Sequence, residues 1–235
     1  MKSLLDGKAA LHHGDCRDVI ATLDDESVNC IVTDPPYECS TTVITRKGQK
    51  NLDSNFGAWD RFDLEWVTEA HRVLTENAGM VVFVPATRFE SFMRACETAG
   101  FQYVQPWFWH KSNPPVSMRN ALQWAVEHMI YVRKGKHKLQ IKNRGSCHNI
   151  FKYPIPAGKY RVHPTQKPVG LMMDIVKLCT VDEEVVLDPF NGSGSTGVAA
   201  LASGRRYIGI EQDRAFYLKT LRRLQNPHQV PQFTF

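Results

Sequence analysis

The stretch VVLDPFNGSGSTGVAALASGRRYIGIE, residues 185–211, decides the fold of this chain of 235 residues. It begins with a short apolar run at 185–187, which predicts a buried strand. A glycine-rich turn, a helix of small residues at 196–202 and a second strand at 207–210 follow, and Glu211 closes that strand. A strand, turn, helix and strand in this order are typical of an α/β protein with a parallel sheet.

The glycines of this turn fit more than one kind of site. Gly192, Gly194 and Gly197 form a G-x-G-x-x-G pattern, which also occurs in tight turns that bind no ligand. A phosphate-binding P-loop is excluded because Val198 stands where that motif requires lysine. NAD and S-adenosylmethionine both remain, since Glu211 can accept hydrogen bonds from the ribose of either. An NAD-dependent oxidoreductase is therefore one hypothesis from this segment alone.

Strands and helices alternate along the rest of the chain as well. We expect strands at 9–13, 28–33, 80–84, 103–109 and 126–132, and helices at 17–23, 64–74, 88–99 and 169–180. This alternation predicts a doubly wound, Rossmann-like α/β sheet that is mostly parallel, with one antiparallel edge strand. We expect residues 1–235 to form a single domain, with a mobile polar loop at about 38–62 and a small basic insertion at about 133–162.

Charge is distributed unevenly along the chain. Residues 133–161 hold nine of the 29 basic residues and none of the 24 acidic ones, which leaves 20 basic against 24 acidic residues elsewhere. A segment this one-sided indicates a polyanionic partner. The six cysteines include no C-x-x-C pair, so we expect no metal site. No apolar run is long enough for a signal peptide or a bilayer span, which predicts a soluble intracellular protein.

A second motif, Asp34-Pro35-Pro36-Tyr37, follows the predicted buried strand at 28–33. Ligands bind at the carboxyl ends of strands in open α/β sheets. The prolines remove backbone donors, so that the Asp34 carboxylate and the Pro35 carbonyl form a cluster of acceptors. Such a cluster suits an exocyclic base amine, whose delocalised lone pair must be localised before it attacks a methyl group. Tyr37 offers a flat surface for an extruded base.

These motifs together resemble the amino-methyltransferase family of DNA methyltransferases. Asp34 to Tyr37 matches the catalytic motif of the family, and 188–194 (DPFNGSG) matches its methyl-donor motif. Residues 163–168 (HPTQKP) and 109–114 (WHKSNP) resemble two further family elements. The catalytic motif precedes the donor motif, which is the permuted order of the β subgroup. The resemblance implies a Rossmann-like methyltransferase domain in circularly permuted order that uses S-adenosylmethionine.

The resemblance also implies roles for individual residues. The catalytic residues would be Asp34, Pro35, Pro36 and Tyr37. Thr165 and Lys167 would hold the methionine carboxylate of the donor, Glu211 its ribose, and Asp15 its adenine amine. As a single residue, Asp15 fits a helix N-cap equally well. The full predicted set for the cofactor is Asp15, Cys16, Asp34, Thr165, Lys167, Asp188, Phe190, Asn191, Gly192, Ser193, Gly194 and Glu211.

Double-stranded DNA is the expected partner, and a buried methyl donor implies that the target base is flipped out of the duplex. The predicted phosphate contacts are Arg46, Lys47, Lys50, Lys111, Lys136, Lys138, Lys142, Arg144 and Lys152. Four aromatic residues can stack on bases, although strand aromatics more often belong to the core: Trp107, Phe108, Trp109 and Trp124. In enzymes that this chain resembles, the region between the elements at 109–114 and 163–168 recognises the target sequence. That region is short here, which predicts a short or relaxed target site.

Adenine N6 is the predicted methyl acceptor, because aspartate at position 34 resembles the adenine enzymes more than serine does. Cytosine N4 is the alternative, since the chemistry at the amine is the same. By analogy with the permuted relatives, we also expect a homodimer, a cognate restriction nuclease and a prokaryotic or phage-encoded protein in the cytoplasm of its cell.

Overall fold

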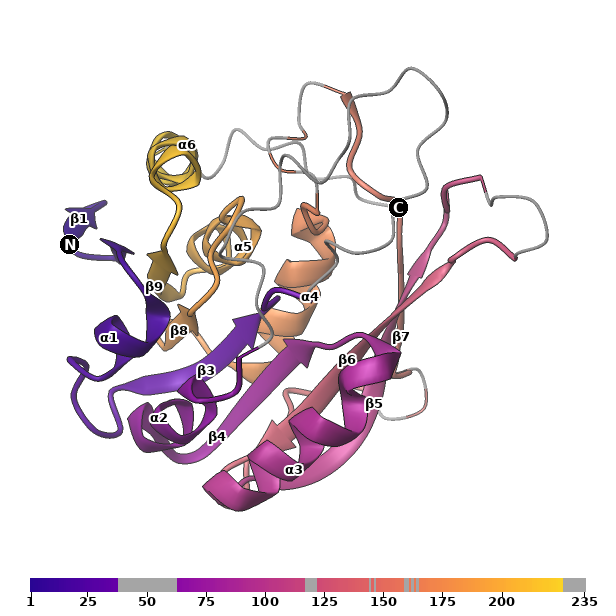
Figure 1. The fold of residues 1–235 in the computed structure, drawn as a ribbon, viewed down its shortest axis with the longest axis horizontal. Coiled ribbons are helices and arrows are strands. Elements are labelled where there is room, and N and C mark those ends of the chain that lie inside the picture. The colour runs from indigo at the N-terminus through magenta and orange to yellow at the C-terminus, as the bar shows by residue number, and fades with distance from the viewer. Residues whose placement is uncertain are drawn as a thin grey trace.

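The computed structural model describes residues 1–37, 63–116, 122–143, 145, 147–158, 161, 163 and 165–225. Within these residues strands and helices alternate along the chain (Figure 1). The elements are β1 (Lys2–Leu4), β2 (Ala9–His13), α1 (Cys16–Ile20), β3 (Val28–Thr33), α2 (Trp66–Val73), β4 (Leu74–Phe83), a 3₁₀ turn (Ala86–Arg88), α3 (Phe89–Ala99), β5 (Gln102–Lys111), β6 (Val126–Arg133), β7 (Ile150–Tyr153), α4 (Val169–Cys179), β8 (Val185–Asp188), α5 (Ser195–Ala202), β9 (Arg206–Glu211) and α6 (Arg214–Leu224).

The described strands form one sheet in the order β1-β2-β9-β8-β3-β4-β6-β5-β7. The neighbours from β2 to β4 are parallel, and so are β5 and β7. The predicted α/β class is therefore confirmed. The prediction of one antiparallel strand at the edge was incomplete. β1 is antiparallel at one edge, but β6 also runs antiparallel inside the sheet, between β4 and β5.

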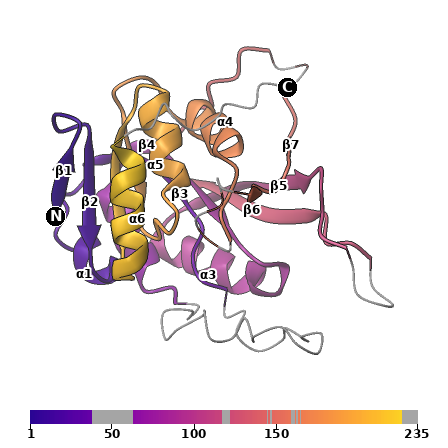
Figure 2. The same cartoon turned by 90° about the horizontal axis from the view of Figure 1, so that it is seen from above.

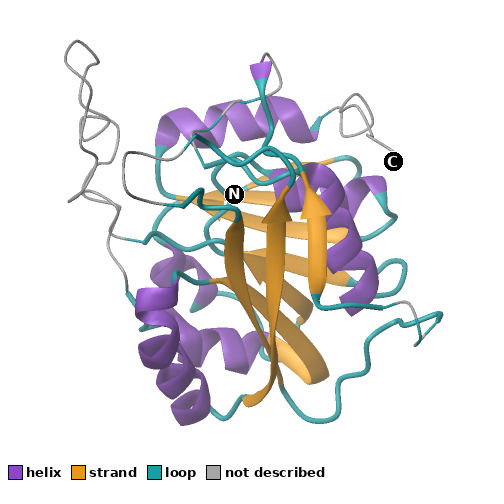
Figure 3. Ribbon diagram, turned by 90° about the vertical axis from the view of Figure 1, so that its right-hand side faces the viewer, coloured by secondary structure: helices purple, strands orange, loops and turns teal. Residues whose placement is uncertain are grey.

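Helices cover both faces of the sheet, as a doubly wound fold requires. α4, α5 and α6 lie on one face and α1, α2 and α3 on the other (Figure 1), and Figure 2 looks onto the first of these layers. Figure 3 shows the strands between the two helical layers. Each layer has its own buried apolar cluster, because successive strand residues alternate between the faces: Val81 and Phe83 face one cluster, Met80 and Val82 the other.

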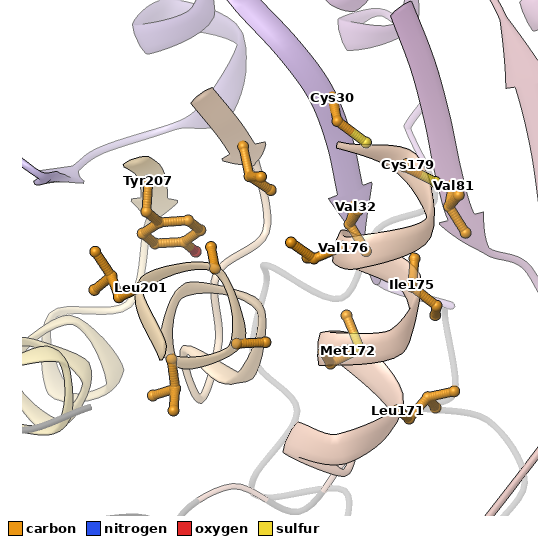
Figure 4. Close-up of a cluster of buried hydrophobic side chains, with 14 of the residues drawn as sticks. Cys30, Val32, Val81, Leu171, Met172, Ile175, Val176, Cys179, Leu201 and Tyr207 are labelled. Atoms are coloured by element: carbon orange, nitrogen blue, oxygen red, sulfur yellow. The ribbon is translucent and has the colours of Figure 1, made fainter. Parts of the chain in front are cut away.

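α4 packs directly onto the centre of the sheet. Cys30 and Val32 of β3 point toward Val176 and Cys179 of α4, and all four side chains are buried (Figure 4). Fully burying a side chain the size of valine contributes roughly 1.5–3 kcal/mol. This packing fixes the position of the segment immediately before α4, where Lys167 lies, relative to the end of β3.

Two strand predictions missed parts of the sheet for local reasons. β4 begins at Leu74 and not at residue 80: Leu74 pairs with Val28, and the register then shifts so that residues 75–78, three of them polar, have no partner on β3 before Gly79 pairs with Cys30. β7 lies inside the predicted basic insertion and forms the edge of the sheet, where its four residues pair with β5. The predicted mobile loop at 38–62 lies outside the described residues.

None of the described helices is both long and apolar enough to span a bilayer.

Candidate active site

The two predicted motifs meet at the carboxyl ends of neighbouring strands. β3 and β8 are parallel neighbours, with Cys30 opposite Val186 and Ile31 opposite Leu187. β3 connects onward to β4 on one side and β8 to β9 on the other, so the point where the strand order reverses lies between them. The Thr33 hydroxyl at the end of β3 donates to Asp188 Oδ1 across this junction, at 2.6 Å. The acceptor cluster and the glycine turn are therefore adjacent.

A cavity of about 370 Å³ opens at this junction. Its volume is within the range of about 300–1,000 Å³ that is usual for small-molecule sites. Its lining includes all four predicted catalytic residues, Asp34, Pro35, Pro36 and Tyr37. It also includes every predicted cofactor residue except Gly194, namely Asp15, Cys16, Asp34, Thr165, Lys167, Asp188, Phe190, Asn191, Gly192, Ser193 and Glu211.

The glycine turn needs glycine for two different reasons. Gly192 and Gly194 have φ angles of 50° and 73°, a region that residues with a Cβ rarely adopt. Gly194 is the N-cap of α5, and a Cβ there would lie 2.6 Å from Thr220 Cγ2. Gly194 therefore allows the turn to pack closely against Thr220 of α6, while its neighbours line the cavity.

Glu211, at the end of β9, closes the opposite wall of the cavity. Its carboxylate accepts the backbone N–H groups of Gly192 at 2.7 Å and of Asp213 at 2.8 Å. Burial nevertheless raises the pKa of Glu211 to about 7. Each carboxylate oxygen has two lone pairs, so both oxygens retain the capacity to accept a further hydrogen bond. Two ribose hydroxyls are groups of the kind that this carboxylate can bind.

Asp34 is held by two donors inside the cavity wall. The Tyr37 hydroxyl donates to Asp34 Oδ1, and the Lys167 ammonium donates to Asp34 Oδ2. Burial raises the pKa of Asp34, and Lys167 offsets only part of that effect. Burial also disfavours the Lys167 ammonium, but its two carboxylate neighbours, Asp34 and Glu127, raise its pKa above the ordinary value.

Glu127 was missed by the sequence analysis, which assigned 126–132 to a strand without weighing its one carboxylate. Glu127 Oε2 lies 3.4 Å from Lys167 Nζ, and Glu127 Oε1 lies 2.8 Å from Lys111 Nζ. An acidic residue in an otherwise apolar strand was the available signal. Lys111 is 8% exposed and paired here, which argues against its predicted contact with a DNA phosphate.

A short helix, α1, follows β2 and is capped by Asp15. Asp15 is the N-cap of α1 and accepts from Arg17 N at 2.9 Å, while its carboxylate also pairs with the Arg17 guanidinium at 2.8 Å. The alternative assignment of Asp15 as a cap is thus what the fold uses, although Asp15 also lines the cavity. Arg17 was not predicted, and it joins Asp15 to Asp63 at 2.9 Å. Burial raises the pKa of the neighbouring Cys16 thiol to about 12.

An aromatic pair also borders the cavity. Trp66 of α2 packs edge-on against Phe190, with ring centroids 5.4 Å apart. The sequence predicted the helix that carries Trp66 but gave this residue no role. On the other side, Thr165 lies beside His163, whose Nδ1 is 3.2 Å from Thr165 N. Burial lowers the pKa of His163 to about 4, so this ring is neutral at ordinary pH.

Most of the described lysines predicted to contact DNA lie far from the cavity. β6 runs away from the catalytic edge over eight residues, or roughly 25 Å. Beyond it, Lys136 N donates to Asn77 Oδ1 at 2.7 Å, and Gln140 N donates to the Leu178 carbonyl at 2.7 Å near the end of α4. Lys136 and Lys138 therefore lie at the amino edge of the parallel strands, and Lys142 follows two residues after Gln140. These positions argue against contacts with a base held near Asp34.

Lys152 is placed differently. It is exposed and pairs with His110 in the β5–β7 ladder, at the end of β5 that reaches the catalytic edge. Of the aromatic residues, Trp107 and Trp109 are buried, whereas Trp124 is 65% exposed next to Ala125, whose carbonyl accepts from Lys111 N at 2.8 Å. The other predicted phosphate contacts, Arg46, Lys47, Lys50 and Arg144, lie outside the described residues.

A doubly wound sheet with a ligand cavity at its switch point defines a nucleotide-binding class of α/β protein, and comparison with known proteins narrows that class. Residues 28–221 match the N6/N4 methyltransferase family, described as DNA methylase. The type II methyltransferase M2.MboI of Moraxella bovis is 30% identical over 237 residues, covering 91% of this chain and 86% of that protein. M2.DpnII of Streptococcus pneumoniae is 30% identical over 242 residues, covering 92% and 89%.

A solved structure, that of the M1.HpyAVI–SAM complex, is similar with a TM-score of 0.74 and 25% identity, covering 92% of this chain and 98% of that chain. The chain belongs to the N6/N4 methyltransferase family of DNA methylases. Membership in this family removes the NAD-dependent oxidoreductase as a hypothesis and leaves the methyl donor as the ligand to be tested against the cavity.

Proposed function

We propose that this protein is a DNA methyltransferase that transfers the methyl group of S-adenosylmethionine to the N6 amine of adenine. One observation carries the proposal: the acceptor cluster at Asp34 and Pro35 and the glycine turn at 190–194 border the same cavity, across the β3–β8 junction. A ligand seated on the turn and an amine held by the acceptors would therefore be neighbours.

The residues around the cavity fit S-adenosylmethionine. Glu211 has acceptor capacity for the two ribose hydroxyls, and the Phe190–Trp66 pair offers apolar surface for an adenine ring. Thr165 and Lys167 supply a hydroxyl and an ammonium for the methionine carboxylate. Gly192, with no side chain and no atom but the Phe190 carbonyl within 4 Å of a Cβ position, leaves room for a ligand to approach the backbone.

When bound, the donor supplies an electrophilic methyl group on a sulfonium. The chain supplies the acceptors for the attacking amine, which are the Asp34 carboxylate and the Pro35 carbonyl. Hydrogen bonds from both N–H groups to these oxygens draw the amine out of conjugation and direct its lone pair. As the new N–C bond forms and the S–C bond breaks, the nitrogen becomes cationic, and Asp34 can accept the proton that it loses.

Adenine is favoured over cytosine by aspartate at position 34, and the resemblance to the adenine enzymes rests on that residue. The target base must leave the duplex to reach a cavity of this kind, which implies base flipping. At the same edge of the sheet as the cavity, Trp124 and Lys152 are exposed beside the end of β5 and are suited to a base face and a phosphate. The short recognition segment supports a short or relaxed target site.

Several finer statements belong to the same proposal. We infer that residues 1–235 act as one permuted methyltransferase domain, with the loop at 38–62 and, within the segment at 133–162, the part around Lys152 contributing to DNA recognition. The type II relatives support membership in a bacterial restriction–modification system. A cognate nuclease, a homodimer and a cytoplasmic location in a prokaryotic or phage-infected cell follow by analogy with that class.

The test is transfer of a tritiated methyl group to unmethylated plasmid DNA, followed by digestion to nucleosides and mass spectrometry. We expect N6-methyladenine from the wild type and none from Asp34→Ala, which removes the acceptor while leaving the glycine turn intact. If the product is N4-methylcytosine, the methyl acceptor is cytosine and not adenine. Binding of S-adenosylmethionine without transfer to any DNA would contradict the proposal, and single-molecule sequencing of the product would give the target site.

A further inference from the structure

A chain of four alternating charges runs from the catalytic carboxylate into the sheet. Asp34 contacts Lys167, Lys167 contacts Glu127, and Glu127 contacts Lys111, each as an ion pair. The four side chains come from four different places: the loop after β3, the segment before α4, β6 and β5. Their formal charges sum to zero, and the two lysines are only 5% and 8% exposed.

The Lys167 ammonium borders the cavity and packs against two aromatic rings beside its two carboxylate partners. It lies 4.7 Å from the centroid of the Phe83 ring and 5.7 Å from that of Tyr37. An ammonium in such surroundings needs a counter-charge, because an unpaired buried charge is costly. Asp34 supplies one, because its Oδ2 accepts a hydrogen bond from the Lys167 ammonium.

Glu127 supplies the second counter-charge, and it has spare capacity. Its Oε1 is taken by Lys111 at 2.8 Å, but its Oε2 makes no hydrogen bond of ordinary geometry with any described atom and lies 3.4 Å from Lys167 Nζ. This oxygen is buried and has no hydrogen-bond partner among the described residues. Glu127 can therefore take a closer hydrogen bond from Lys167 whenever Asp34 gives one up.

Asp34 must release one of its two hydrogen-bond donors before one of its oxygens can accept a strong hydrogen bond from a substrate amine. With Tyr37 on Oδ1 and Lys167 on Oδ2, both carboxylate oxygens already accept a donor. We propose that Glu127 is a positioning residue for methyl transfer, which retains Lys167 when Asp34 turns an oxygen toward the amine. This inference rests on the proposed function, since it assigns Glu127 a part in the reaction of the same cavity.

The groups that face Asp34 set the expected pH dependence. They are Lys167, Glu127 and Tyr37, with Asp188 on the neighbouring strand β8 and His163 beyond Lys167. Burial raises the pKa of Asp34 and the negative charge of Glu127 raises it further, whereas Lys167 lowers it. Removing the charge of Glu127 should therefore lower the pKa of Asp34, so that Asp34 stays ionised to a lower pH.

Glu127→Gln tests the inference, because it removes the charge with almost no change of shape. We expect kcat to fall about 10- to 100-fold, since Lys167 then holds Asp34 more firmly, with little change of KM for DNA. We also expect the acid limb of the profile of kcat/KM against pH to move to lower pH. Glu127→Asp should restore part of kcat. Glu97→Gln, which changes an exposed carboxylate on α3, is the matched control and should leave both quantities unchanged.

Lys111→Gln provides a second measurement at the far end of the chain of charges. Without Lys111, Glu127 attracts Lys167 more strongly and draws it from Asp34, so we expect the acid limb to move to higher pH. If the melting temperature shows that Glu127→Gln does not fold, the shift of the acid limb to higher pH in Lys111→Gln tests the role of Glu127 alone. An active wild type whose acid limb is unmoved in these variants overturns the role of Glu127 and leaves the proposed function standing. A wild type that transfers no methyl group overturns both.

Discussion

Lowering the pH should weaken the binding of S-adenosylmethionine through a single carboxylate, Glu211. Burial raises the pKa of this group to about 7, so it is largely protonated below that pH in the free protein. As the proposed acceptor of the ribose hydroxyls it binds best when ionised. For one such group, the dissociation constant should rise about tenfold between pH 8.5 and pH 6, a loss of about 1.4 kcal/mol.

Isothermal titration calorimetry without DNA measures this effect directly. Glu211→Gln is the control, because it removes the titration but keeps the length of the side chain. The variant should bind more weakly at high pH, and the difference between its pH response and that of the wild type isolates the titration of Glu211 from any titration of the ligand itself. The window ends at pH 6 because burial raises the pKa of Asp188 to about 6, so that below this pH Asp188 is mostly protonated as well and Glu211 is no longer the main group that titrates. A wild-type affinity that is constant from pH 8.5 to pH 6 would refute the assignment of Glu211.

Three further outcomes follow from placement and packing. Trp124→Ala should weaken DNA binding by about 1–3 kcal/mol, measured by fluorescence anisotropy, if its exposed ring stacks on a base. Lys152→Gln should reduce the slope of DNA affinity against salt concentration by about one, whereas Lys136→Gln at the far edge should leave it unchanged. Gly197→Ala should lower the free energy of unfolding by about 1–3 kcal/mol, because the new Cβ would lie 2.5 Å from the Tyr207 ring. An unaltered melting curve would show instead that α5 can shift to make room.

The parts of the fold that the sequence predicted are those where local pattern and tertiary demand agree. β3 was predicted residue for residue, because a short, mostly apolar run rich in β-branched residues and ended by Asp34-Pro35 favours a buried strand. The helix α3 was predicted to end at residue 99, where it does end, because Gly100 follows with a φ of 99°. β1 and β7 were missed because they have three and four residues and obtain their strand geometry from a neighbour. α6 was missed despite Asp213, which caps it by accepting from Ala215 N and Phe216 N.

The candidate site was predictable where it consists of short motifs and unpredictable where it consists of contacts between motifs. Asp34 follows one strand and Glu211 ends another, and the carboxyl ends of parallel strands share one edge, so their meeting could be expected. The pairing of Lys167 with Asp34 and Glu127 could not, because it depends on the order of strands in the sheet. That order places β6 beside β4, although β5 lies between them in the sequence. Only this arrangement brings the carboxylate of a central strand to the segment before α4.

The same reasoning limits where DNA can approach. A base that reaches Asp34 must come over the carboxyl edge of the sheet, so a charge near the amino edge cannot contact the flanking phosphates closely, however basic its segment is. Net charge along the sequence favoured the residues from Lys136 to Lys142, but β6 carries the chain to the wrong edge before they occur. Lys152 and Trp124 flank the end of β5 instead, one through the β5–β7 ladder and the other beside Ala125. We therefore expect the duplex to lie across the β5 end of the catalytic edge, and phosphate contacts mapped by salt dependence should concentrate there.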